Sequence, residues 1–230
     1  MKKIIIAIVS IPLLIILILA VNYIIFQNTA VQVSQGNPIS QKEIIKQAVL
    51  VIDIQEGTTG SLSDEEYYKL RSEDLINTIN QITDSSARHN IPVIYVKNEI
   101  TNFLINILND TYAPGSPGSK LDARLNVVSD IILNKDKGDA FSNPALDSLL
   151  AANEINKLVF TGLDLAHCIN STIMAAKNRN YDISLISDAV LAKSDSLKTV
   201  WLDEFNQSGI GSITSDKYFE HLNKQVLRPL

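Results

Sequence analysis

The chain has very little cysteine, histidine and tryptophan. Its 230 residues include one cysteine, three histidines and one tryptophan. A single cysteine cannot form an internal disulfide, so the fold must depend on packing rather than on covalent cross-links. The histidines (His89, His167 and His221) do not have the spacing of metal ligands. We therefore predict no metal site and no cofactor.

The chain also lacks an excess of positive charge. It has 20 basic and 25 acidic residues, a formal net charge of −5. Two of the basic residues, Lys2 and Lys3, precede an apolar run at the N-terminus, and without them 18 basic residues face 25 acidic ones, a net of −7. Nucleic-acid-binding domains usually carry a basic patch or stripe. No nucleic-acid partner is therefore expected.

One long hydrophobic run is present, at the N-terminus. Ile4–Phe26 contains 23 residues without a charge, and about 20 apolar residues are enough to span a bilayer as a helix. Pro12 does not argue against this, because membrane helices accept proline better than soluble helices do. Residues 1–26 are therefore predicted to be a membrane anchor. The alternative is a signal sequence that is removed.

The surroundings of this run favour an uncleaved anchor. The run is longer than a usual signal core, and Asn28-Thr29-Ala30 is a poor cleavage site. Lys2 and Lys3 precede the run and no positive cluster follows it soon, which places the N-terminus in the cytoplasm. We expect a single-pass protein of the cell membrane with its domain outside the cytoplasm; secretion after cleavage is the alternative. Residues 27–41 are predicted to be a linker and residues 42–230 one α/β domain.

Chemically useful side chains follow three predicted strands. Apolar runs typical of strands that are buried on both faces of a parallel sheet occupy 48–55, 131–141 and 157–161. Asp53 and Lys135 stand at the ends of the first two, and Cys168 follows the third. Ligands of open α/β sheets bind outside the carboxyl ends of the strands. The three side chains would thus place an acid/base pair and a nucleophile on one edge. Helices are predicted at 65–90, 143–153 and 195–206.

The only cysteine follows a strand in a position suited to a nucleophile. Gly162 breaks the strand, and Cys168 is predicted to open an apolar-periodic helix. The unpaired N–H groups and partial positive charge of a first helical turn stabilise a thiolate. The alternative is an inert structural thiol, because free cysteine is among the most buried residue types. Asp53 and Lys135 have ordinary alternatives as well, a turn cap and a solvated lysine.

Four short motifs, in order and with consistent spacing, strengthen the catalytic interpretation. They are Asp53-Ile54-Gln55, Lys135 before Asp139-Ala140-Phe141, Thr161-Gly162-Leu163 followed by Cys168-Ile169, and Asn180-Tyr181-Asp182-Ile183 running on to Ser187-Asp188-Ala189. With these motifs the chain resembles the isochorismatase-like cysteine hydrolases from about Gln47 to about Phe219. The resemblance implies a three-layer α/β/α fold around a mostly parallel, Rossmann-like sheet.

The resemblance also implies roles for the three side chains. Cys168 would attack a carbonyl or imine carbon and form a covalent, thioester-type intermediate. Asp53 would accept the thiol proton and pass it to the leaving group. Lys135, favoured over Lys137 by its spacing to Phe141, would balance their charges. The implied activity is hydrolysis of a small molecule at a non-peptide C–N bond. The alternatives are vinyl-ether hydrolysis, as in isochorismatases, and a binding domain without catalysis.

The family carries a cis peptide that corresponds to Leu163–Asp164 and helps to aim backbone N–H groups at an oxyanion. By resemblance, Leu163, Asp164 and His167 are expected to bind the oxyanion or the substrate. The alternative for His167 is an exposed residue of the first helical turn. The chain departs from the family at Leu165-Ala166, where a threonine and an acidic residue are usual. Asp164 is expected to cap the following helix there, since a short acidic side chain is a good N-cap.

The nicotinamidase branch of the family carries a histidine-containing metal site after its second strand. Here the corresponding strand, Ile91–Val96, is followed by Lys97-Asn98-Glu99, without histidine. This departure disfavours nicotinamidase and leaves the substrate open. The 113–118 loop, rich in glycine and proline, is interpreted as either a lid or a plain connection. Members of the family often self-associate, so a homo-oligomer remains open.

Overall fold

The structure, a computed structural model, describes residues 2–40 and 43–226. A single six-stranded sheet forms its centre, with strand order β3-β2-β1-β4-β5-β6 and parallel pairing between all neighbours. The strands are β1 Gln47–Ile52, β2 Val93–Asn98, β3 Ile132–Lys135, β4 Lys157–Gly162, β5 Asp182–Val190 and β6 Gly211–Ile213.

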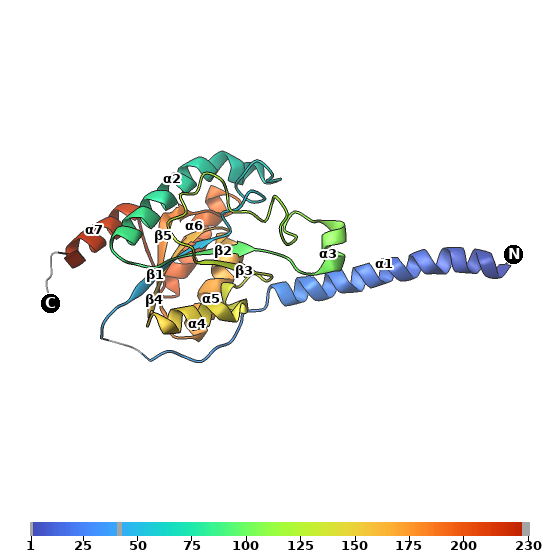
Figure 1. Ribbon diagram of the computed structural model, residues 1–230, viewed down its shortest axis with the longest axis horizontal. Coiled ribbons are helices and arrows are strands. Elements are labelled where there is room, and N and C mark those ends of the chain that lie inside the picture. Colours follow the sequence, from blue (N-terminus) through green and yellow to red (C-terminus); the bar gives the residue numbers. More distant parts are fainter. Residues whose placement is uncertain (1, 41–42, 227–230) are drawn as a thin grey trace.

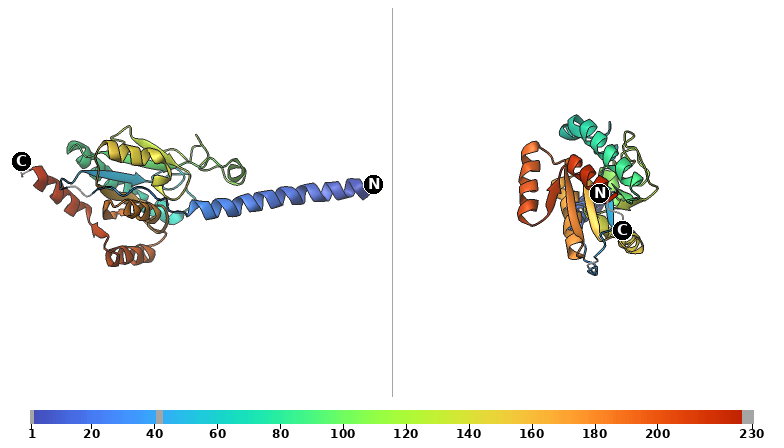
Figure 2. Two further views of the ribbon diagram at one scale, coloured as in Figure 1. Left: turned by 90° about the horizontal axis from the view of Figure 1, so that it is seen from below. Right: turned by 90° about the vertical axis from the view of Figure 1, so that its left-hand side faces the viewer.

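Helices cover both faces of the sheet, which confirms the predicted three-layer α/β/α arrangement (Figures 1 and 2). One face is covered by α2 Glu66–Arg88 and α7 Ser215–Val226, and the other by α4 Pro144–Ala152, α5 Asn170–Asn178 and α6 Asp195–Gln207. The helices predicted at 65–90, 143–153 and 195–206 are thus present, whereas β6 and α7 were not predicted. Short helical segments complete the domain: α3 Phe103–Leu108, η1 Ala140–Ser142 and η2 Leu165–Ile169.

The central strand β1 shows why the sheet is buried on both sides. Leu50 and Ile52 pack into the core under α4 and α5, while Val49 and Val51 pack against α2, and all four are at most 1% exposed. A strand with apolar residues on both faces suits a parallel sheet that is covered by two helical layers.

The strand order places two carboxyl ends side by side at the middle of the sheet. β1 and β4 are adjacent, and from this pair the chain winds outward in opposite directions. Ile52 pairs with Gly162, the last residue of β4. Gly162 has φ +107°, and a Cβ there would collide with the carbonyl oxygen of Ile52. Glycine therefore lets the two strand ends approach at the point where open α/β sheets bind ligands.

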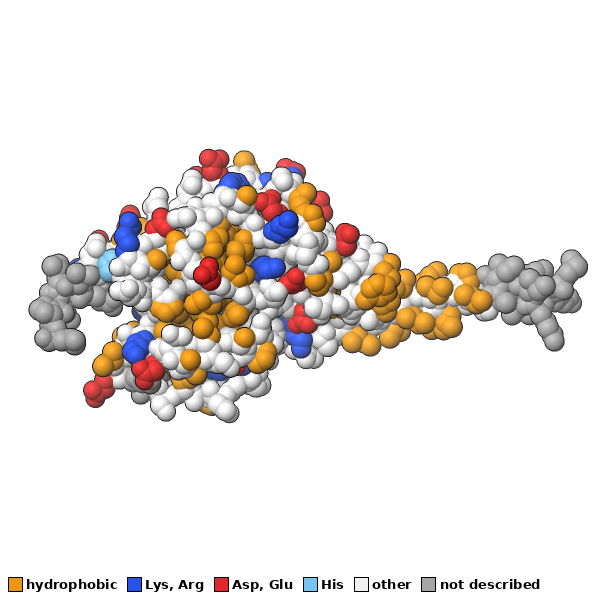
Figure 3. Space-filling view, viewed as in Figure 1, with side chains coloured by type: hydrophobic (Ala, Val, Ile, Leu, Met, Phe, Trp, Pro, Cys, Tyr) orange, Lys and Arg blue, Asp and Glu red, His pale blue; other side chains and the backbone are white. Residues whose placement is uncertain are grey.

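The N-terminal helix α1, Lys2–Ala30, projects away from the domain (Figure 1). Its Ser10–Ala30 part is long and apolar enough to cross a membrane, a property that a signal sequence shares. Most of the large hydrophobic side chains described along it are exposed, and Figure 3 shows them as a nearly continuous apolar surface.

Residues 31–40, the larger part of the predicted linker, lie on the surface of the domain. The Ser34 N–H donates to Asp139 Oδ2 at 2.8 Å, and the Arg179 guanidinium donates to the carbonyl oxygens of Ser34 and Gln35 at 3.2 and 3.1 Å. The Ile39 N–H donates to the Arg179 carbonyl at 2.8 Å, and the Ile39 side chain packs against the core. The segment therefore continues directly from α1 onto the folded domain.

Candidate active site

Asp53, Lys135 and Cys168 lie together at the carboxyl edge of the sheet. Lys135 Nζ is 2.9 Å from Asp53 Oδ2 and donates to Cys168 Sγ at 3.3 Å. The Lys135 side chain is fully buried and that of Asp53 is 6% exposed, while Cys168 is partly buried. An ammonium group thus stands between a carboxylate and a thiol, and the three side chains share one edge of the sheet, as their positions after the strands predicted. Lys137, the competing lysine, does not make these contacts.

Asp53 sits on a tight turn immediately after β1. Its φ of +55° is uncommon for a residue with a side chain, and such conformations persist where the surroundings impose them. Thr58 Oγ1 donates to the Asp53 carbonyl and accepts from the Gln55 N–H at 3.0 Å. Asp53 Oδ1 is buried without a hydrogen-bond partner among the described residues. One carboxylate oxygen therefore remains free to accept a proton.

Gln55, the other polar residue of the first motif, has a structural rather than a chemical role. Its fully buried side chain donates to the carbonyl oxygens of Asn98 and Ser119 at 3.0 and 2.9 Å, and accepts from the Asn98 N–H at 2.7 Å. It thereby ties the end of β1 to the end of β2 and to the loop that precedes Leu121.

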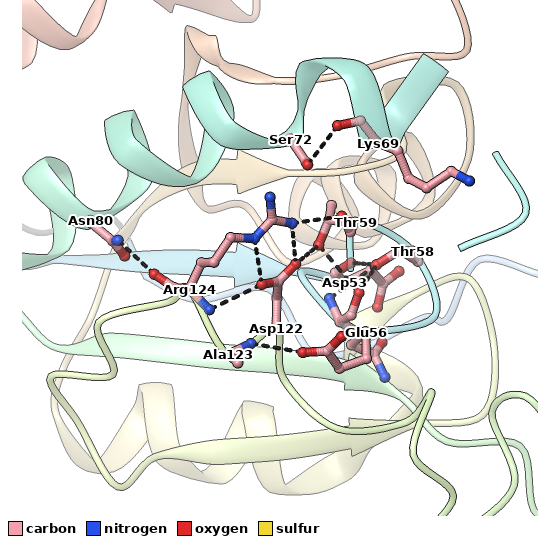
Figure 4. A network of polar contacts seen from close by, with 11 residues as sticks. Asp53, Glu56, Thr58, Thr59, Lys69, Ser72, Asn80, Asp122, Ala123 and Arg124 are labelled. Carbon is pink, nitrogen blue, oxygen red and sulfur yellow. Dashed lines mark hydrogen bonds and ion pairs between the residues drawn. The ribbon is translucent and has the colours of Figure 1, made fainter. Parts of the chain in front are cut away.

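A second polar network braces the same turn from outside (Figure 4). Arg124 donates to both carboxylate oxygens of Asp122, at 2.9 and 2.7 Å, and to the Thr59 carbonyl at 2.6 Å. The Thr59 hydroxyl donates to Asp122 Oδ2 at 2.7 Å. Bidentate charge-assisted bonds of this kind fix the relative orientation of the two side chains. Residues 53–60 are therefore held by Gln55 at their beginning and by Thr59 near their end.

Cys168 does not open an α-helix, in contrast to the prediction. It is the fourth residue of η2, a π-type turn over Leu165–Ile169, and α5 begins only at Asn170. Asp164 caps this turn: its side chain accepts from the Ala166 N–H at 2.7 Å, which confirms the predicted cap. π-turns are frequent at functional sites, where they displace one side chain from the regular helical path.

The surroundings of Cys168 favour the neutral thiol over the thiolate. Burial, together with the Asp53 carboxylate, raises the pKa of Cys168 to about 12, and the Lys135 ammonium acts in the opposite direction. This differs from the thiolate that a first helical turn would favour. Burial alone would lower the pKa of Lys135, but the Asp53 carboxylate and the Cys168 sulfur outweigh it and raise that pKa. Lys135 therefore keeps its charge.

The three residues expected at the oxyanion or substrate position have structural partners. The Leu163–Asp164 peptide is cis, as the resemblance implied. The Leu163 N–H donates to the Ile52 carbonyl at 3.0 Å, and the His167 N–H donates to the Asp164 carbonyl at 3.1 Å. The His167 side chain is exposed, as its alternative interpretation held. The oxyanion role of Leu163, Asp164 and His167 stays a prediction.

Two tyrosines near the site were not assigned from the sequence. The Tyr68 hydroxyl donates to the Asp164 carboxylate, and the Tyr112 hydroxyl donates to the Gly57 carbonyl at 2.8 Å. Burial first, and then the Asp53 carboxylate, raise the pKa of Tyr112, and its hydroxyl bond joins the ring to the turn that follows Asp53. Tyr112 carried no sequence signal because it lies in an irregular loop without periodicity.

A cleft opens beside Lys135 on the same edge. Its lining comes from Glu99, Thr101, Pro114, Asn134, Lys135, Asp136, Ser142, Asn143 and Pro144. Where nicotinamidases carry a metal ligand after the second strand, Lys97 and Glu99 form an ion pair at 3.5 Å. Within residues 2–40 and 43–226, no group of three or more His, Cys, Asp or Glu side chains is placed to hold a metal ion.

Comparison with known proteins places the chain among hydrolases. Over 149 residues it is 25% identical to an uncharacterized isochorismatase family protein, YrdC, of Bacillus subtilis, covering 64% of this chain and 74% of that protein. A shorter match, 38% over 69 residues, joins it to the ureidoacrylate amidohydrolase RutB of Methylorubrum extorquens, over 30% of this chain and 28% of RutB.

A solved structure supports the same placement. N-carbamoylsarcosine amidase from Thermoplasma acidophilum superposes with a TM-score of 0.64 at 28% sequence identity, covering 75% of this chain and 98% of that one. The model of the isochorismatase domain matches residues 47–217, the stretch that runs from β1 into α7 and holds Asp53, Lys135 and Cys168. The chain therefore belongs to the isochorismatase family of hydrolases.

Proposed function

We propose that this protein is a cysteine-dependent amidohydrolase that cleaves a non-peptide C–N bond of a small molecule. The observation that carries the proposal is the position of Lys135 Nζ between Asp53 Oδ2 and Cys168 Sγ in a buried site. A vinyl-ether hydrolase or a binding domain would not need a nucleophile beside a carboxylate that has a free oxygen.

The proton path follows from the resting charges. Asp53 Oδ1 accepts the Cys168 proton as Sγ attacks the carbonyl carbon, so the C–S bond forms while the proton moves to the carboxylate. The protonated Asp53 then donates to the departing nitrogen as the C–N bond breaks. A water molecule, deprotonated by Asp53, hydrolyses the thioester-type intermediate and returns the thiol. Lys135 remains an ammonium ion throughout and stabilises the negative charge that passes between Asp53 and Cys168.

The names of two relatives suggest the first substrates to test. One is an amidohydrolase of ureidoacrylate and the other an amidase of N-carbamoylsarcosine. Both compounds contain a carbamoyl group on nitrogen, so we propose ureido and N-carbamoyl compounds as the substrate class. The match to RutB covers only 28% of that protein, so the proposal depends chiefly on the site itself.

The test is ammonia release from a panel of ureido, N-carbamoyl and simple amide compounds by the full chain in detergent. We expect turnover of at least one compound, its loss in Cys168→Ala, and trapping of an acyl-enzyme by mass spectrometry in the unaltered chain. Lys137→Ala, a neighbouring lysine outside the site, serves as the matched control and should retain activity. Equal turnover by Cys168→Ala and the unaltered chain would reject the cysteine mechanism.

We further propose that α1 anchors the protein in the cell membrane with the hydrolase domain outside the cytoplasm. The length and apolar character of Ser10–Ala30 support an anchor, and Lys2 and Lys3 on its N-terminal side support this orientation.

A further inference from the structure

α3 exposes apolar side chains at the tip of the segment that joins β2 to β3. Phe103 is 73%, Ile107 58% and Leu108 57% exposed. The ten residues from Ile100 to Asn109 carry no charge. Apolar patches of this kind on soluble surfaces usually mark an interaction site.

α3 lies directly against α1 (Figure 1). The apolar groove between the two helices is lined by Leu17, Ile18, Val21, Asn22, Ile25 and Leu104. The apolar run of α1 ends at Phe26. At 1.5 Å per residue, the groove therefore lies from about 1.5 to about 14 Å inside the end of that run. Interfacial helices bury their apolar faces about 5–10 Å into a membrane. If α1 crosses a bilayer, α3 reaches lipid depth with it.

Several backbone groups at the ends of α3 have hydrogen-bond partners within the chain, which lowers the cost of placing the segment in lipid. The Asn102 side chain accepts from the N–H groups of Leu104 and Ile105 at 3.0 and 3.2 Å, which caps the first turn. At the other end, the Asn109 N–H donates to the Ile105 carbonyl at 2.9 Å, and the Asn106 side chain donates to the Ile100 carbonyl at 2.9 Å. Both ends of this six-residue helix therefore have hydrogen bonds within the chain, while the Asn106 Oδ1 atom is buried without a partner among the described residues.

The C-terminal end of α1 contacts the domain at one particular edge of the sheet, and this contact would determine which edge faces a membrane. The Ala30 carbonyl accepts from the Gly138 N–H at 2.9 Å, and Gly138 lies three residues after Lys135. α3 itself follows β2 by a few residues, and its segment continues to Tyr112 beside the triad. Gly138 and α3, the two parts of the domain described here as contacting α1, therefore both lie at the carboxyl edge of the sheet. The strands point toward α1 and end at this edge (Figures 1 and 2).

We propose that α3 inserts into the bilayer beside α1, and that the carboxyl edge of the sheet, which holds Cys168, faces the lipid surface. The occupant of the exposed face of α3 is lipid rather than a second protein, because this face continues the apolar surface of α1 and carries no charge that would select a protein partner. The inference goes beyond the proposed hydrolase activity and does not require it, although it does require that α1 spans the membrane.

The test uses the depth-dependent quenching of an indole by lipid with brominated acyl chains. The chain has a single tryptophan, Trp201 on α6, so Trp201→Phe combined with Phe103→Trp places the only indole on α3. The full chain, with α1 verified by intact mass, is reconstituted in phosphatidylcholine vesicles. The matched control combines Trp201→Phe with Ile45→Trp, because Ile45 is 56% exposed and precedes β1 at the opposite edge.

We expect brominated lipid to reduce emission from position 103 severalfold and to shift it to shorter wavelength, while the indole at position 45 is unaffected. Salt should not change the result, because an uncharged segment inserts without electrostatic attraction. An indole at position 103 that emits as strongly in brominated as in ordinary lipid overturns the proposal. This includes the case in which a second copy of the chain covers α3, where the emission shifts without quenching.

Discussion

At the residue scale, burial and two opposite charges beside the thiol act on Cys168. Burial raises the pKa of the thiol most, the Asp53 carboxylate raises it further, and the Lys135 ammonium lowers it. These surroundings favour the neutral thiol, the form of cysteine that is less readily oxidised than the thiolate. Reactivity toward a general alkylating agent and catalytic activity are consequently separate properties of this site.

This separation predicts opposite effects of two substitutions on alkylation by iodoacetamide. The unaltered thiol should react slowly at neutral pH, with a rate that rises through alkaline pH toward a pKa of about 12. Asp53→Asn removes the charge that raises the pKa, so labelling at pH 7 should become at least about tenfold faster while hydrolysis is lost. Lys135→Met should slow labelling further. If the labelling rate depends on pH in the same way in all three proteins, the charges of Asp53 and Lys135 do not control the pKa of the Cys168 thiol.

Gly162 gives a residue-scale prediction about stability. Gly162→Ala places a Cβ against the Ile52 carbonyl, at a φ that side chains rarely adopt. The backbone strain alone costs about 1–3 kcal/mol, and the collision adds to it. Gly209→Ala is the matched control, because Gly209 also has positive φ but nothing lies near its Cβ. Urea unfolding should show a clearly larger loss for Gly162→Ala, and equal losses would contradict the close approach of β1 and β4.

At the element scale, the segment after α1 is held by side chains that lie far away in the sequence. Arg179 is 2% exposed, donates to Asp147 at 2.7 and 2.9 Å and to Ser34, and stacks over the Phe141 ring at 4.4 Å. The stack adds a cation–π contribution to these bonds. One arginine thus joins α4, η1 and residues 34–35, the segment that follows α1.

Arg179→Gln should therefore loosen residues 31–40. We expect faster amide hydrogen exchange in a peptide that covers 31–40, and a smaller change in β1 and β4, whose contacts do not involve this side chain. Arg71→Gln is a suitable control, because Arg71 forms an ion pair with Asp195 in which both side chains are largely exposed, and such pairs contribute about 0–1 kcal/mol. Similar exchange of 31–40 in both variants would show that Arg179 does not hold the segment.

The sequence could predict the residues that follow buried strands, but not the position of residues 31–40 or of α3. Asp53, Lys135 and Cys168 follow apolar runs, and the topology of parallel sheets brings such strand ends to one edge. The docking of residues 31–40 could not be predicted, because it depends on contacts between Ser34 and Arg179, which are 145 positions apart. α3 was missed for a different reason: its exposed apolar face has no core partner, so it lacks the polar-apolar pattern of a helix in water.

At the scale of the whole molecule, an apolar helix leads into residues 31–40, which lie on the surface of the domain. The charge-free helix ends at the domain surface, where Ala30 contacts Gly138. If α1 stays in the membrane, the domain cannot move far from the bilayer. If α1 is removed, the surface that it covers on α3 becomes exposed to water. The retention of α1 would therefore decide whether the carboxyl edge of the sheet lies near a membrane.

Retention and orientation can be measured together in bacterial cells that express the full chain. We expect the protein to remain in carbonate-washed membranes with an intact mass that includes residues 1–26. Protease added to spheroplasts should degrade the domain, and protease added to inverted membrane vesicles should not, because Lys2 and Lys3 hold the N-terminus in the cytoplasm. Ala substitution of both lysines should weaken this orientation, whereas Lys137→Ala should not. A soluble product that lacks the first 26 residues would show that the run is a signal sequence, and degradation in inverted vesicles alone would place the domain in the cytoplasm.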